Sequence, residues 1–186
     1  DGESIERLSV GERRRRGLRY LTDDRLGEGS IGAFPVAINM LLKDIGAAPY
    51  WHRGLEQRAA IDAHAGELVA AFDVRAPGVA TPVGRLSGGN IQKVILAREL
   101  SGAARVVIYS KPTYGLDVHN TASARRRIAA AAAAGVATIL ISTDLDELLE
   151  LADRIAVMAR GRFAGTVVND DSARGRIGEL MSGVAA

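Results

Sequence analysis

The stretch from Leu86 to Leu100 constrains what this chain can fold into more than any other part of its sequence. A serine and two glycines open it, and a helical pattern follows, with one face formed by Ile91, Val94, Ile95 and Arg98. Glycine lets a ligand approach the main chain closely, and the N–H groups of a first helical turn bind anions. The hydroxyl of Ser87 adds a donor, so the expected ligand is a phosphate group. In the alternative interpretation, Ser87 is only the N-cap of a structural helix.

Composition sets wider limits on the fold and on the partners. The 186 residues suffice for one domain with a sizeable core, and the absence of cysteine excludes disulfide and thiolate chemistry. The formal net charge of +2 gives no strong attraction to nucleic acid or to a membrane surface. The longest apolar run, Ile128–Ile141, is rich in alanine and too short to cross a bilayer. Because the first residue is Asp1 and not methionine, we expect a piece of a longer protein.

The polar opening, from Asp1 to Arg16, ends in four consecutive arginines. Such a run raises the hypothesis of nucleic-acid binding. No aromatic residue is interleaved with the arginines, and the net charge of the chain is small. A solvated turn is therefore the favoured interpretation, and nucleic-acid binding stays the weaker alternative.

Beyond this opening the chain alternates between strand and helix patterns. Apolar runs predict strands over residues 17–21, 105–109 and 136–142, and a hairpin over 154–158 and 163–168 with a tight turn at Gly161. Besides the helix that follows the two glycines, helical spacing predicts helices over 35–42, 55–74, 118–134, 144–152 and 172–181. Gly135 suits the position just beyond a helix end, and Asp144 with Glu147 resembles a capping box. We interpret His64 as a surface or packing residue rather than a ligand.

This alternation predicts an α/β fold, with a mostly parallel sheet and helices on both of its faces. Residues 35–101 are predicted to form a helical subdomain set into the α/β core. The core itself would comprise residues 1–34 and 102–186.

The order of three motifs resembles that of ATP-binding-cassette (ABC) ATPases. Leu86–Leu100 resembles their signature motif, Pro112–Asp117 their Pro-Thr and Gly-Leu-Asp loop, and Asp144–Glu147 the short helix that follows the next strand. The resemblance implies a P-loop NTPase core with an inserted helical signature subdomain. Residues 22–25 and 145–158 are closest to the second cassette of the double-cassette proteins that energise bacterial importers of simple sugars and nucleosides.

Several positions depart from the pattern of that family. No G-x-x-x-x-G-K-[ST] phosphate loop occurs in the sequence; in the family it lies upstream of the residue matching Asp1, so we expect it to have been cut away. Ser110 and Lys111 stand where the family has an aspartate that supports Mg²⁺ and a glutamate that positions water. Thr143 stands at the switch histidine and Asp23 at the glutamine of the Q-loop. The catalytic site of this chain is therefore predicted to be degenerate, without a metal ligand of its own.

The retained residues are those that serve another subunit in the family. The resemblance implies that Ser87, Gly88, Gly89 and Asn90, with Asp117 of the D-loop, contact ATP in trans, while a partner cassette holds the nucleotide and its Mg²⁺. It further implies transmembrane permease subunits as partners, a peripheral location on the cytoplasmic face of the plasma membrane, and no nucleic acid. Whether the chain counts as an enzyme stays open, because the chain alone is predicted not to hydrolyse ATP. The alternative is a non-catalytic interaction domain that couples a permease to another cassette with an idle signature.

Overall fold

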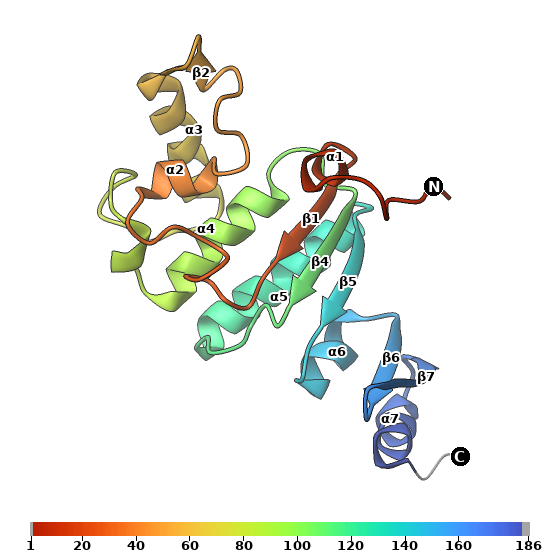
Figure 1. Ribbon diagram of the computed structural model, residues 1–186. Coiled ribbons are helices and arrows are strands. Elements are labelled where there is room, and N and C mark those ends of the chain that lie inside the picture. The colour runs from red at the N-terminus through yellow and green to blue at the C-terminus, as the bar shows by residue number, and fades with distance from the viewer. Residues whose placement is uncertain (1, 184–186) are drawn as a thin grey trace. The chain divides into compact units, whose positions relative to one another are not determined.

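The computed structural model describes residues 2–183, which divide into two compact units between Ile141 and Ser142 (Figure 1). The first unit contains, in chain order, α1 (Val10–Arg15), β1 (Leu18–Leu21), α2 (Val36–Met40), β2 (Trp51–His52), β3 (Leu55–Glu56), α3 (Arg58–Ala71), a 3-10 turn (Val83–Arg85), α4 (Gly88–Leu100), β4 (Val106–Ser110), α5 (Val118–Ala133) and β5 (Ala137–Ile141). The second contains α6 (Leu145–Leu151), β6 (Arg154–Ala159), β7 (Arg162–Val168) and α7 (Ala173–Ser182).

A parallel sheet of three strands, in the order β1–β4–β5, forms the centre of the first unit. Leu21, Tyr109 and Leu140 are aligned across the three strands, and Leu21 and Tyr109 are fully buried. This confirms the predicted α/β fold with a parallel sheet. Because the carboxyl ends of parallel strands meet at one edge, the loops after β1 and β4 lie together there.

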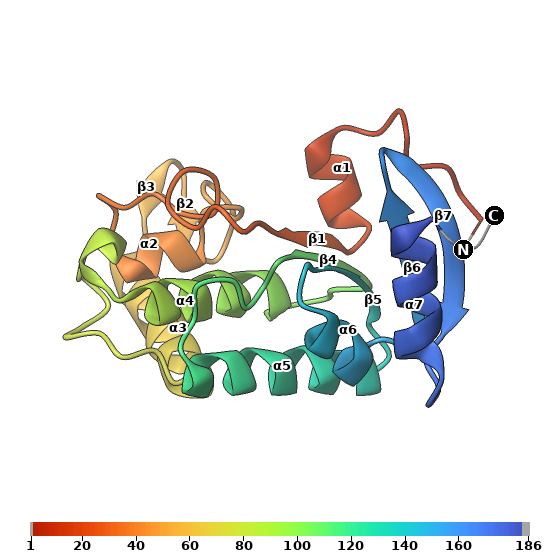
Figure 2. The same ribbon diagram turned by 90° about the horizontal axis from the view of Figure 1, so that it is seen from below.

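The signature helix α4 connects this sheet with the helical end of the unit. It contacts β1 as well as α2, α3 and α5, and it lies on the same side of the sheet as α5 (Figure 2). Nearly every residue from Gly89 to Glu99 is buried, including Val94, Ile95 and Leu96. A helix buried on most of its circumference is held firmly, which fixes the place of its first turn.

The helical end contains α2, α3 and the small β2–β3 hairpin (Figure 1). The predicted helix over residues 55–74 corresponds to α3, which buries Ile61, Ala65 and Leu68 on one face. The predicted start of this helix at residue 55 is wrong, because residues 55–56 pair with β2 and the helix begins at Arg58. His64 lies in α3 with its ring 5.0 Å from that of Tyr50, as expected for a packing residue.

The arginine run near the N-terminus is not a turn, as was predicted, but the helix α1. Ser9 caps it in a capping box with Glu12, whose carboxylate accepts a hydrogen bond from the Ser9 N–H at 2.8 Å. Arg13 donates to the carbonyl groups of residues 5 and 6, and Arg14 to the carbonyl group of residue 43 and to Asp44. Arg16 forms an ion pair with Glu3, so three of the four arginines are engaged within the chain, which weakens the nucleic-acid hypothesis.

One face of the three-stranded sheet remains exposed within the first unit. Tyr20, Ile108 and Ile139 are aligned on this face; Tyr20 is 47% and Ile139 51% exposed, and Ile141 further along β5 is 52% exposed. Helices on both faces were predicted, whereas α4 and α5 both lie on the opposite side (Figure 2). The division into residues 1–34, 35–101 and 102–186 stays a prediction.

The second unit packs the β6–β7 hairpin against α7 around Ile155, Val157, Val167 and Ile177. The hairpin follows the predicted strands, and its turn has positive φ at residues 160 and 161, as a tight two-residue turn requires. Asp144 caps α6 by accepting a hydrogen bond from the N–H of residue 147, which is one half of the predicted capping box, while its own N–H donates to Ser142 Oγ at 3.0 Å. Among the described residues, no helix is both long and apolar enough to span a membrane.

Candidate functional site

The first turn of α4 presents an open anion-binding geometry. Ser87 is the N-cap residue, yet its side chain makes no cap hydrogen bond to the helix. Ser87 and Gly88 are exposed, whereas Gly89 is buried. The first N–H groups of a helix have no partner within it, so those at Gly88 and Gly89 are available to an anion. The interpretation of Ser87 as a plain cap explains its position in the helix but not the use of its hydroxyl.

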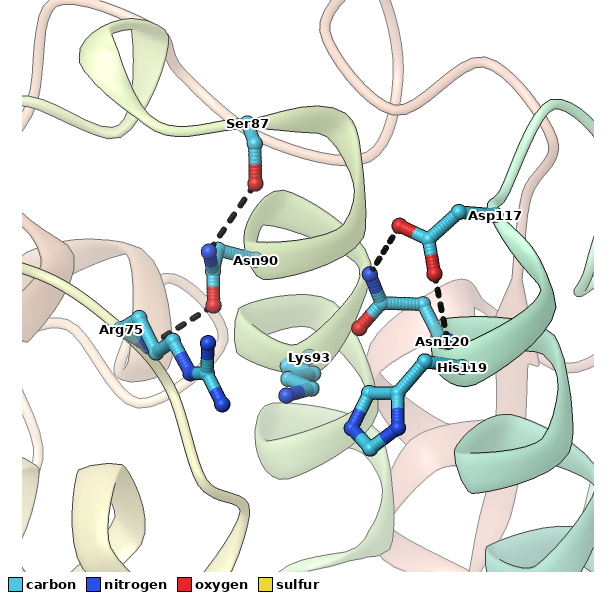
Figure 3. A pocket seen from close by; sticks show the side chains of 7 residues that line it. All are labelled: Arg75, Ser87, Asn90, Lys93, Asp117, His119 and Asn120. Atoms are coloured by element: carbon cyan, nitrogen blue, oxygen red, sulfur yellow. Dashed lines mark hydrogen bonds between the residues drawn. The ribbon is translucent and has the colours of Figure 1, made fainter.

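Asn90 orients that hydroxyl. Its Nδ2 donates to Ser87 Oγ at 2.9 Å, and its Oδ1 accepts from the backbone N–H of Arg75 at 2.7 Å (Figure 3). Because Ser87 Oγ accepts this bond, its own proton is left to point elsewhere. The hydroxyl can therefore donate to a ligand above the helix start.

Asp117 and Asn120 pack the start of α5 against the start of α4. The carboxylate of Asp117 accepts from the backbone N–H of Asn120 at 2.8 Å and from its Nδ2 at 2.6 Å, and these bonds, the backbone bond first, lower the pKa of Asp117. A Cβ at Gly89 would lie 2.4 Å from Asn120 Nδ2. Only glycine permits this close approach of the two helices.

These residues line a pocket of about 410 Å³ between the two helix starts (Figure 3). Its lining is polar and mostly cationic or amide, and consists of Arg75, Ser87, Asn90, Lys93, Asp117, His119 and Asn120. The Lys93 ammonium, at the centre of the view, donates to Asp73 at 2.8 Å and lowers the pKa of that carboxyl. The structure thus brings the predicted residues Ser87, Asn90 and Asp117 to one pocket.

Four of the lining residues were missed by sequence reasoning. Lys93 and Asn120 could have been found from spacing. Lys93 follows Asn90 by three residues on the same helix face, and Asn120 follows the predicted site residue Asp117 by three residues at the start of a helix. Arg75 and His119 carry no such signal. The loop that holds Arg75 reaches the pocket through the contact of its backbone with Asn90.

The positions predicted to be degenerate form a second cluster at the ends of β1 and β4. Ser110 Oγ donates to Asp23 Oδ1 at 3.2 Å, and Lys111 Nζ lies 3.2 Å from Asp23 Oδ2. The hydrogen bond from Lys111, the largest effect, lowers the pKa of Asp23. Thr143 belongs to the second unit, where it is exposed just before the cap of α6.

This cluster does not fit a Mg²⁺ ion. The cluster offers one carboxylate, and the ammonium of Lys111 already pairs with it. Across residues 2–183, no group of three or more acidic, histidine or cysteine side chains is placed to hold a metal ion. The arrangement connects the loop after β1 to the end of β4, and both oxygens of its one carboxylate are already engaged, by Ser110 and Lys111.

A three-stranded parallel sheet, an inserted helical end and a glycine-rich start of a buried helix define the fold of an ABC cassette. Solved structures share this fold: a dimeric post-hydrolysis state of the ATP-binding cassette MJ0796 bound to ADP and Pi has a TM-score of 0.72 at 18% identity, over 91% of this chain and 72% of that one. A nucleotide-free ATP-binding cassette from an ABC transporter also has a TM-score of 0.72, at 17% identity over 91% and 70% of the two chains.

The chain belongs to the family of ABC ATP-binding proteins. It is 36% identical to the ribose import ATP-binding protein RbsA 2 of Rubrobacter xylanophilus and 32% identical to the guanosine import ATP-binding protein NupO of Bacillus subtilis. Each match covers 98% of this chain, which spans about a third of the length of either relative (35% and 36%). No protein-family model matches the chain.

Proposed function

We propose that this chain is part of the ATP-binding subunit of an importer of simple sugars or nucleosides, and that it acts on ATP in trans. Ser87, Gly88 and Gly89 would contact the γ-phosphate of ATP that a partner cassette holds with its Mg²⁺. The observation that carries the proposal is the exposed start of α4, where the Ser87 hydroxyl is oriented by Asn90 and does not cap its own helix. Preorganised donors of this kind stabilise the charge of a phosphoryl group.

Asp117 has a supporting role in this proposal. Its carboxylate accepts a hydrogen bond from Asn120, and the side chain of Asn120 lies against Gly89. A displacement of the loop before α5 would therefore move the residues that contact the start of α4. The partner cassette, permease subunits and a peripheral location on the cytoplasmic face of the membrane belong to the same proposal. They are supported by the import functions named for the relatives.

Gly88→Asp tests the trans contact. Its carboxylate would stand where the γ-phosphate approaches, and two like charges about 4 Å apart near a protein surface repel by about 4 kcal/mol, roughly a thousandfold in rate. The new Cβ would lie 3.2 Å from Arg25 Nη1, a contact that a shift of a few tenths of an ångström relieves, and a helix start tolerates aspartate, so the fold should survive. Gly88→Asn is the matched control, with the same shape and no charge.

The assay measures ATP hydrolysis by the partner cassette and permease reconstituted with each variant. We expect Gly88→Asp to lower the rate far below that of Gly88→Asn. Equal rates for wild type and Gly88→Asp would mean that the signature is idle, and that the chain is an interaction domain that couples a permease to another cassette without contacting nucleotide.

A further inference from the structure

The loop after β1 is attached to both ends of the segment that follows β4. Asp23 binds the beginning of that segment, through Ser110 Oγ and Lys111 Nζ, each at 3.2 Å. Arg25 binds it three residues further on, where its Nη2 donates to the carbonyl oxygen of Tyr114. Two residues of one loop therefore hold residues 110–114 at two points.

Arg25 also binds the signature helix. Its Nε donates to Gln92 Oε1 at 2.8 Å, and Gln92 Nε2 donates to the carbonyl oxygen of Pro112 at 2.8 Å. Gln92 is 1% exposed, and both ends of its amide are used. The bonds form a closed circuit through Arg25, Gln92 and residues 112–114, which is buried at Gln92 and reaches the surface at Tyr114. Hydrogen bonds connected in this way reinforce one another.

The guanidinium group of Arg25 lies directly against the start of the signature. A Cβ at Gly88 would be 3.2 Å from Arg25 Nη1. The backbone that carries Arg25 is itself held, because Ser30 Oγ donates to the Arg25 carbonyl oxygen at 2.6 Å and Asp24 Oδ1 accepts from the Gly27 N–H at 2.8 Å. A movement of this loop must therefore be transmitted through Arg25 to its partners.

We propose that Asp23 and Arg25 form a clasp that sets the position of the signature start relative to residues 110–117, with Arg25 as a positioning residue acting through Gln92 and the carbonyl of Tyr114. The clasp uses, as anchors, three of the four positions at which this chain is expected to depart from a catalytic cassette: Asp23, Ser110 and Lys111. The consequence for function rests on the trans role proposed above. In that role, the clasp would present Ser87 and Asp117 to the partner cassette as one rigid unit.

The backbone at Lys111 supports this assignment. Its φ is +41°, a conformation that a residue with a side chain rarely adopts. The residue is held there by the Lys111 N–H bond to the carbonyl oxygen of Ile141 at 2.7 Å and by the ion pair with Asp23. A strained backbone conformation of this kind persists only where surrounding contacts hold the residue in place, which is common at functional sites. Here the result is that the ammonium reaches across to the loop after β1.

Hydrogen exchange tests the clasp in the chain by itself. Arg25→Met removes the hydrogen bonds to Gln92 and to the Tyr114 carbonyl at once, so amide exchange within residues 86–93 and 111–117 should become about tenfold faster, because charged hydrogen bonds are lost. Arg126→Met, at an exposed arginine on α5, is the control for the loss of one positive charge and should leave both segments unchanged. Unchanged exchange in Arg25→Met would overturn the proposal. If Arg25→Met does not fold, Arg25→Lys, which keeps the charge and one donor, should show the same pattern with a smaller acceleration.

The reconstituted importer then separates positioning from general stability. With Arg25→Met, the kcat of the partner for ATP should fall about tenfold while its KM changes less than about twofold, because the nucleotide is held elsewhere. Asp23→Lys and Lys111→Asp should each lower kcat, and the double variant should restore it in part; equal loss in the singles and the double would contradict a clasp. A normal rate of ATP hydrolysis with Gly88→Asp would contradict the proposed trans role of the signature. It would not affect the hydrogen-exchange result for Arg25→Met, so the trans role and the clasp can be refuted separately.

Discussion

At the scale of single residues, Tyr109 carries a hydroxyl that the folded core leaves unsatisfied. The side chain is fully buried on β4, its Oη has no hydrogen-bond partner among the described residues, and burial raises the pKa of the phenol to about 12. An unsatisfied buried polar atom costs about 1–3 kcal/mol. We therefore expect Tyr109→Phe to increase the free energy of unfolding by about 1–2 kcal/mol in urea denaturation, with the slope unchanged. A less stable variant would show that the hydroxyl has a partner.

Residue identity predicted some parts of the site and not others. The serine and two glycines before an apolar helix indicated a helix start that could bind phosphate. In the structure, Ser87 and Gly88 at this helix start are exposed. Rules of sequence spacing do not predict which residues from distant parts of the chain each site residue contacts. Arg75 reaches Asn90 from 15 positions away, and Arg25 reaches Gln92 from 67 away, so these contacts follow from the tertiary fold alone.

At the scale of elements, the end of α4 is anchored by a buried ion pair. Lys43 Nζ donates to both carboxylate oxygens of Glu99, at 2.6 and 2.7 Å, and Glu99 is fully buried. Arg98 is the remaining partner of that carboxylate, at 2.8 Å. Removing one partner of a buried pair leaves an uncompensated charge, which costs about 3–5 kcal/mol when burial is complete.

Lys43→Met should therefore destabilise the fold by about 2 kcal/mol, the lower figure reflecting a lysine side chain that is 34% exposed. Arg58→Met is the matched control, because its pair with Asp62 on α3 is exposed on both sides and should change stability by less than about 0.5 kcal/mol. Thermal melts of both variants give the comparison. Equal effects would mean that Glu99 is adequately neutralised by Arg98.

Element types were predicted well where the apolar period is long and poorly where charge dominates. The strands and the long helices were found because burial repeats along them. The helix α1 was not predicted, although Ser9 and Glu12 form a capping box, because the arginine run was interpreted from its charge as a solvated turn. Strand β3 was interpreted as the start of a helix, because a two-residue strand carries no period.

At the scale of the whole molecule, the first unit exposes one face of its sheet, and the described sheet ends in two edge strands, β1 and β5. Tyr20, Ile139 and Ile141 lie on the open face, and β5 is an edge strand within the described sheet. Exposed apolar faces and unpaired edges promote association. We expect the isolated chain to self-associate in light scattering, and a double variant, Ile139→Thr with Ile141→Thr, to reduce this association while retaining β propensity. A wild-type chain that is monomeric with a sharp cooperative melt would contradict the expectation.

The last prediction concerns catalysis by the chain alone. Its sequence contains no phosphate loop, and Ser110, Lys111 and Asp23 bind one another instead of a metal or a water molecule. Because each lost electrostatic contact costs about 3–4 kcal/mol, and about 1.4 kcal/mol is tenfold in rate, Mg²⁺-dependent phosphate release should not rise above background. Lys111→Glu alone should not restore it, since the new carboxylate would face Asp23 and repel it while the phosphates still lacked a loop to hold them. Phosphate release by purified chain, with and without chelator, is the measurement, and Mg²⁺-dependent turnover at about 1 per second or more would refute the argument.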